Sequence, residues 1–160
     1  MILNHYNAIK TVLNTSLNGT VKEKNITWYN DQYNRTEEVK GHSWPAVFIE
    51  FVQPINWQQT GNGLLTANVD INLHVVMHKL IDDPTALLLL SNDVFKAVNN
   101  KAIEENYQLS SELVLSASNL VEGYDNLKAN VLTFTTEIAS NYGMQELTEV
   151  PVKFKVNLEK

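Results

Sequence analysis

The sequence contains no cysteine. It can therefore have no disulfide, no cysteine-ligated zinc site and no thiolate nucleophile. A chain of 160 residues does not need such cross-links, because a domain of this length buries roughly 70% of the surface that its unfolded form exposes. We expect one domain over residues 1–160 that is held together by an apolar core.

Basic side chains are scarce: 12 Lys and Arg stand against 18 Asp and Glu, which gives a net charge of -6. Proteins whose main task is to bind phosphate backbones need basic clusters, so this composition disfavours that class. Long apolar runs are also missing, since the longest, Ala86 to Leu90, is far shorter than the roughly 20 residues of a membrane-spanning helix. With no secretory signal in its first residues, the sequence predicts a soluble protein that is made inside the cell and has no membrane partner.

Signatures of catalysis are missing as well. His74 and His78 have the spacing of a zinc pair, but they lie in a predicted strand and no Glu follows the first histidine. Asp82 and Asp83 are explained by helix capping alone, and Gly61-Asn62-Gly63 is too short for a phosphate-binding loop. There is no nucleophile elbow and no spaced pair of acids. The sequence therefore predicts no catalytic residue, no cofactor and no metal site.

The clearest positive signal is the stretch 66–78, where apolar and polar side chains alternate. Alternation with period two over this length is typical of a strand with one buried and one solvent-exposed face. The Asp82-Asp83-Pro84 sequence then predicts the start of a helix that runs to about residue 103. We expect this helix to cover the apolar face of the strand. The apolar side is Ala67, Val69, Ile71, Leu73, Val75 and Met77, and the solvent-exposed side is Asn68, Asp70, Asn72, His74 and His78.

The remaining elements complete an α+β pattern. An apolar stripe from Ile2 to Leu17 predicts an opening helix that ends near Gly19. Strand 47–52 should pair antiparallel with strand 66–78 through the glycine-bearing turn. The sequence thus predicts a mostly antiparallel twisted sheet packed against two helices, with an extra C-terminal strand. The other predicted strands are 21–29, 113–118, 131–138 and 152–158.

The last of these strands lies in a C-terminal extension or arm, residues 141–160. In it Val152, Phe154 and Val156 alternate with Lys153 and Lys155. Such a strand either adds to the sheet of its own subunit or pairs with a sheet edge of a neighbouring subunit. Both alternatives remain open.

Contact residues are predicted in three segments. The polar run Asn30 to Glu38 has the composition of an exposed loop or hairpin arm. The aromatic residues of the first third either form a recognition surface or pack internally. The candidate contact residues, taken from this loop, the turn at 58–64 and the C-terminal strand, are Asp31, Tyr33, Arg35, Gln58, Asn62, Lys153, Phe154 and Lys155.

Three short patches add a family resemblance to this pattern: Pro45-Ala46-Val47, Ala67-Asn68-Val69-Asp70-Ile71 and Gly123-Tyr124-Asp125. Together with the order of the elements, they resemble the tail terminator proteins of long-tailed bacteriophages. The resemblance covers residues 1–140. The segment 141–160 is additional to the family pattern, which leaves open a sister role as a neck, head-completion or head-to-tail joining protein.

The resemblance implies a structural protein of the virion, made in the host cytoplasm and placed in the tail or neck. It implies a homo-oligomeric ring, usually hexameric, that caps the tail tube and joins it to the head connector. The tail tube protein and a head-completion or connector protein are the implied partners, and DNA passes through the lumen without specific binding. A different class stays open: a monomeric α+β module that holds a ligand or peptide through the aromatic third of the chain.

Overall fold

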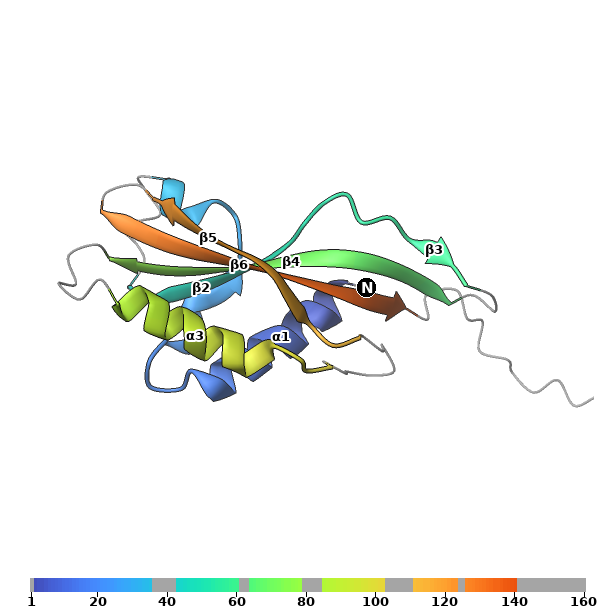
Figure 1. Ribbon diagram of the computed structural model, residues 1–160, viewed down its shortest axis with the longest axis horizontal. Helices are drawn as coiled ribbons and strands as arrows, with labels where there is room; N and C mark the ends of the chain where they lie inside the picture. The colour runs from blue at the N-terminus through green and yellow to red at the C-terminus, as the bar shows by residue number, and fades with distance from the viewer. Residues whose placement is uncertain are drawn as a thin grey trace, which may run out of the picture.

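Two α-helices lie on one face of a six-stranded sheet in the computed structural model (Figure 1). The structure describes residues 2–35, 43–60, 64–78, 85–102, 111–123 and 126–140. The predicted α+β class, a mostly antiparallel sheet packed against two helices, is confirmed. In chain order the elements are α1 (Ile2–Ser16), η1 (Glu23–Asn25), β1 (Ile26–Trp28), η2 (Gln32–Asn34), β2 (Ala46–Phe51), β3 (Gln58–Gln59), β4 (Leu65–His78), α3 (Ala86–Val98), β5 (Val114–Glu122) and β6 (Leu127–Ser140).

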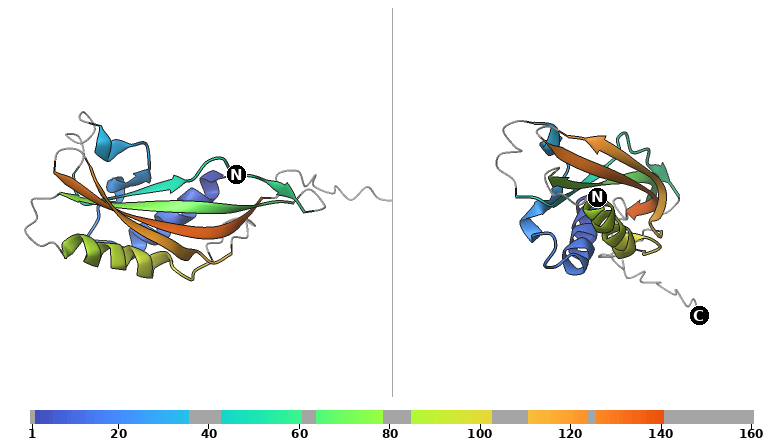
Figure 2. Two further views of the ribbon diagram at one scale, coloured as in Figure 1. Left: turned by 45° about the horizontal axis from the view of Figure 1, so that its top comes forward. Right: turned by 60° about the vertical axis from the view of Figure 1, so that its left-hand side comes forward.

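Strand β4 is the centre of the sheet. The strand order is β1-β2-β4-β6-β5, and the short β3 pairs with the start of β4. All neighbours are antiparallel except β1 and β2, which are parallel. The predicted antiparallel pairing of the second and the long strand is therefore confirmed, and Figure 2 shows the resulting twisted sheet. This order leaves β1 and β5 as the two edges.

Helix α1 forms where the apolar stripe predicts it. Ile9, Leu13 and Leu17 are almost fully buried, as expected for residues three or four positions apart on one helix face. The helical turn is followed by Gly19, whose φ of 88° lies in the left-handed region that glycine adopts without strain. The predicted end of the opening helix near Gly19 is confirmed.

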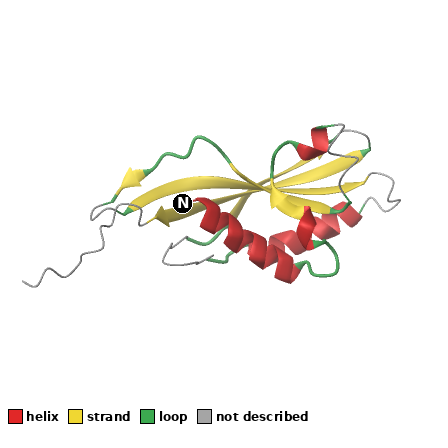
Figure 3. Cartoon of the chain, turned by 180° about the vertical axis from the view of Figure 1, so that it is seen from behind, coloured by secondary structure: helices red, strands yellow, loops and turns green. Residues whose placement is uncertain are grey.

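The main core lies between the sheet and the two helices, which Figure 3 shows on the same side of the sheet when seen from behind. Val69, Ile71 and Leu73 of β4 belong to it. The apolar stripe of α3 packs into the same cluster, so the predicted covering of this strand face by the helix is confirmed. The contributing α3 residues are Leu87, Leu90, Val94, Ala97 and Val98.

Helix α3 is shorter than the sequence predicts. It ends at Val98, not near residue 103, because Asn99 is extended and Asn100 has a positive φ of 55°. The backbone of Asn100 then donates a hydrogen bond to the carbonyl of Leu113, 2.8 Å away. Pairing with the segment that leads into β5 thus replaces the last helical turn. The predicted cap at 82–84 lies outside the described residues.

The expectation of a solvent-exposed polar face along all of strand 66–78 is wrong for its second half. His74 is 5% exposed and Val76 is fully buried. A second apolar cluster covers them on the face opposite the helices, and it includes Tyr33 and Phe48. The turn η2 brings Tyr33 over this face, so the predicted exposed loop at Asn30 to Glu38 is also wrong at Tyr33, which is 3% exposed.

Two strands are longer than predicted. The expected strand 113–118 extends to Glu122, and the expected strand 131–138 runs from Leu127 to Ser140. The two form a hairpin in which Gly123 donates its backbone hydrogen bond to the carbonyl of Leu127, 2.9 Å away. The predicted glycine turn at 61–63 and the predicted strand 152–158 lie outside the described residues.

The core predicts a clear contrast between two substitutions to alanine. Phe134→Ala removes a fully buried ring from β6 and should lower the free energy of unfolding by about 3 to 5 kcal/mol. Leu3→Ala truncates an α1 side chain that is 64% exposed, and it should change that free energy by less than about 0.5 kcal/mol. Urea unfolding followed by circular dichroism measures both, and equal effects would contradict this account of the core.

Candidate functional site

A histidine lies between a tyrosine and a glutamate on the face of the sheet opposite the helices. The Oη of Tyr33 is 2.9 Å from Nδ1 of His74, and Nε2 of His74 is 2.9 Å from Oε2 of Glu50. A carboxylate can only accept, so Nε2 must carry the hydrogen and the bare Nδ1 of the neutral ring accepts from the phenol. The ring of Tyr29 stacks on His74 with centroids 4.0 Å apart, which closes the cluster from the outside.

Hydrogen bonds continue from this cluster across the sheet. The Nδ2 of Asn72 donates to Oε2 of Glu50 over 2.7 Å, and the Oγ1 of Thr133 donates to Oδ1 of Asn72 over 2.8 Å. One step further along, the Oγ1 of Thr135 donates to Oδ1 of Asp70 over 2.7 Å. These bonds link side chains of β2, β4 and β6. The polar groups of this face therefore hold the strands together.

Burial sets the protonation of the cluster. It lowers the pKa of His74 below its usual value, against the opposing effect of Glu50. It raises the pKa of Tyr29 and of Tyr33. The ring of His74 is thus neutral near pH 7 and both phenols keep their protons. With all three groups engaged in bonds or stacking, the arrangement stabilises the fold and offers no free nucleophile at this place.

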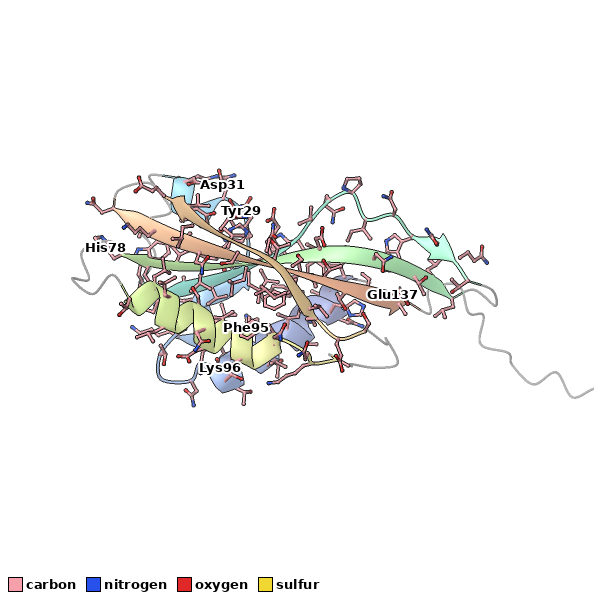
Figure 4. The ribbon with its side chains drawn as sticks, in the orientation of Figure 1. Tyr29, Asp31, His78, Phe95, Lys96 and Glu137 are labelled. Carbon is pink, nitrogen blue, oxygen red and sulfur yellow. The ribbon has the colours of Figure 1, made fainter. Side chains whose placement is uncertain are left out.

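The predicted contact residues differ in their exposure to solvent, and Asp31 and Arg35 are the pair that remains accessible. Asp31 accepts hydrogen bonds from Tyr29 (3.0 Å) and Asn34 (2.6 Å), and its neighbour Arg35 forms an ion pair with it at 4.0 Å. Figure 4 shows Tyr29 and Asp31 beside each other at one end of the sheet. About half of the Asp31 and Arg35 side chains is exposed, so both can be reached by a partner.

Of the other predicted contact residues, the structure describes Tyr33 and Gln58. Tyr33 is buried, so it cannot serve as the surface contact that the sequence predicts. Gln58 is exposed in β3, where it pairs with Thr66. Asn62, Lys153, Phe154 and Lys155 lie outside the described residues.

The sequence predicts the strand at β5 but not its exposure to solvent. Eight of the nine residues of β5 are exposed, and Leu120 is 70%, Val114 52% and Val121 39% exposed. An apolar pair such as Leu120-Val121 ordinarily predicts burial, so only the tertiary structure reveals this surface. Helix α3 adds Leu88 and Leu89, which are 52% and 59% exposed. Large exposed apolar side chains are typical of protein contact surfaces when they form a patch, and β5 and α3 each carry a neighbouring pair of them.

The aromatic residues of the first third contact one another and the core, although Trp28 remains 42% exposed. Trp28 stacks on Phe51 with ring centroids 5.7 Å apart and also contacts Tyr6. Trp44 meets Phe48 edge to face at 6.3 Å. Of the two alternatives that the sequence left open for these residues, the contacts support packing.

A polar hollow lies between the end of α1 and the Trp44-Pro45 segment. The buried amide of Asn25 in its wall already donates to the carbonyls of Ser43 and Pro45, over 2.6 and 3.1 Å. The hollow therefore has no unpaired Asn25 group to offer a ligand. Within the described ranges, no three His, Asp or Glu side chains converge as a metal site would require.

Comparison with known proteins gives a likeness in fold. No protein-family model matches the sequence, and neither does any curated protein. The chain resembles a virion protein in fold. A chain from the virion of a native gene transfer agent (GTA) particle superimposes with a TM-score of 0.53, over 84% of this chain and 96% of that chain. At 10% sequence identity this likeness shows the fold alone.

No described helix has the length and apolar character needed to cross a membrane.

The buried histidines predict how stability depends on pH. Burial lowers the pKa of both His74 and His5 below 6.5 in the folded chain, so the unfolded chain binds more protons below that pH. The free energy of unfolding should be highest above pH 6.5 and fall as the pH drops towards the folded-state pKa values. The slope should not exceed about 1.4 kcal/mol per pH unit for each histidine.

Urea unfolding at pH 7.5, 6.5 and 5.5 measures this slope. The His74→Gln variant should show a smaller slope than the natural chain, and the double variant with His5→Gln should show the smallest. Identical slopes in all three proteins would show that neither histidine controls the pH dependence.

Proposed function

We propose that this chain is a non-enzymatic structural protein of a phage-like virion, a ring subunit that caps the tail tube and joins it to the head connector. The observation that carries the proposal is the fold shared with a chain of the GTA virion along nearly the whole length of that chain. The order of the elements and the Pro45-Ala46-Val47 and Gly123-Tyr124-Asp125 patches resemble tail terminator proteins, and this resemblance supports the specific role in the tail. Copies of the chain, the tube protein and a head-completion or connector protein are its proposed partners.

The exposed apolar residues supply the surfaces that a ring needs. A closed head-to-tail ring requires two different, complementary patches on each subunit. Leu120 and Val121 lie at the β5 edge, whereas Leu88 and Leu89 lie on α3. Such a pair of separate apolar patches suits heterologous contacts between neighbouring copies.

The polar face of the sheet suits the wall of a DNA channel. The described residues on the helix-free face of β1, β2, β4, β5 and β6 include the acids Glu50, Asp70 and Glu137 but no Lys or Arg. Acidic walls repel phosphates and so would let a genome pass without holding it. We propose that this face lines the lumen.

A neck or head-completion ring is the second proposed role. It uses the same fold and the same kind of surface, and the additional segment 141–160 is the feature that favours it. The monomeric binding module is less well supported, because the aromatic residues that would hold its ligand pack against Phe51, Phe48 and His74.

Assembly is the direct test of the proposal. The full-length chain should form closed rings, and native mass spectrometry should detect a single high oligomer, six chains if the family pattern holds. Negative-stain electron microscopy should show a central hole, and the rings should bind to the end of tail tubes. A chain that stays monomeric at high concentration and beside tail tubes would contradict the ring.

Charge reversal tests the lumen assignment. In rings of Glu137→Lys, each subunit places a cation on the proposed wall, so retention of duplex DNA should rise at low salt and disappear at high salt. Glu23→Lys changes the net charge equally at an exposed residue of η1, away from the sheet face, and should retain DNA less. Gel-shift assays at 50 and 300 mM salt compare the two variants. Equal retention would mean that the polar face does not line the channel.

A further inference from the structure

Strand β5 is an edge strand of the described sheet, and its outer side is engaged at one point near its start, where the backbone N–H of Leu115 donates to Oδ1 of Asn99, 3.2 Å away. It pairs with β6 on one side, and no described strand pairs with its other side. Edge strands are usually kept short, charged or covered, because their unpaired backbone groups recruit further strands. β5 has nine residues, most of them exposed, and its only charged residue is Glu122 at its end. It therefore has few of the features that keep a second strand away.

We propose that this edge receives the segment 152–158 from a neighbouring copy as an additional strand. The inference rests on the ring of the proposed function and names the segment that links its subunits. The sequence Val-Lys-Phe-Lys-Val-Asn-Leu alternates with period two, which suits a strand with one apolar and one polar face. Its length of seven residues fits the nine residues of β5.

The direction of the chain favours a neighbouring copy. β5 begins with Val114 opposite Thr135, whereas β6 continues to Ser140. The chain therefore leaves the sheet five residues, about 17 Å, beyond the start of β5 and heads away from it. If the β5 of a neighbouring copy lies ahead of Ser140, the segment can enter it without a reversal of this direction.

A return onto the same subunit is less favourable in either direction. For antiparallel pairing, the linker 141–151 would have to pass back to the level of Leu120, which pairs with Asn130. That is about 33 Å along β6 from Ser140, and the linker reaches at most roughly 40 Å when fully extended. Parallel pairing would require a reversal as well, and parallel ladders are slightly less stable per residue.

The segment 152–158 also matches the surface of a neighbouring copy in charge and in apolar character. The last ten residues carry three Lys and one Glu, so the rest of the chain has a net charge of -8. The net positive charge of the segment complements the net negative charge of a neighbouring copy, and its apolar side can cover exposed residues such as Leu120.

Disulfide mapping tests the strand exchange. Because the natural chain contains no cysteine, every disulfide must come from the introduced residues. Full-length chains with Asn119→Cys in β5 are mixed with chains that carry one cysteine at positions 153 to 157. After mild oxidation, at least one tail position should link to Asn119→Cys as a two-chain product. A double variant with both cysteines in one chain should give a ladder of covalent oligomers. Glu23→Cys, an exposed residue outside the sheet, is the matched control and should not link to the tail.

Three results would overturn the exchange. One is an intrachain disulfide in the double variant, which would show that the segment returns to its own β5. Another is efficient linking of Asn119→Cys to itself, which would show two β5 edges pairing with each other. The third is no link at any tail position.

A charge placed on the apolar side of the segment 152–158 tests the strand exchange separately from the ring of the proposed function. Phe154→Lys should raise the concentration at which rings half assemble by about tenfold or more, the equivalent of one anchor side chain. Leu3→Lys makes the same change at an exposed α1 residue and should leave assembly unchanged. Rings that form equally well with Phe154→Lys would refute the strand exchange and leave the ring intact. Failure of the unchanged full-length chain to form rings would refute the ring itself.

Discussion

The antiparallel pairing of β4 with β6 is the constraint on which the rest of the structure depends. The two strands are in register from Leu65 opposite Ser140 to His78 opposite Leu127. A slip by one residue would turn every side chain of a strand to the other face, which would expose Leu73 and Phe134 and bury polar residues. The two helices can pack on the sheet only because this register gathers the apolar side chains on one face.

The opposite face is divided into two parts by the same register. At one end, Tyr33 and its neighbours cover His74 and Val76, so a second cluster forms beyond the main core. At the other end, Asp70, Thr135 and Glu137 remain exposed to solvent. One long sheet thus combines a part that is closed by its own chain with a polar part that is free to face a lumen. In the proposed ring, this polar part is the one that would face the DNA.

The two edges of the sheet differ in length and exposure. β1 is short and pairs with β2, whereas β5 is long, exposed and backed by β6. The apolar side chains left at β5 and on α3 have no partner strand or helix among the described elements, although burying them would be favourable. A second copy of the chain can supply that cover, which links the proposed ring and the proposed strand exchange to the same physical cause.

The sequence by itself determined the elements whose apolar residues follow a regular period. Helix α1, strand β2, strand β4 and the central part of β6 follow directly from spacing, because period two or 3.6 decides which residues share a face. Tertiary structure decided what lies on each face and at each edge. Only folding could show that Tyr33 covers His74, that α3 stops at Val98 to let Asn100 pair with Leu113, and that Leu120 is exposed. These outcomes depend on contacts between residues far apart in the chain, which no local period records.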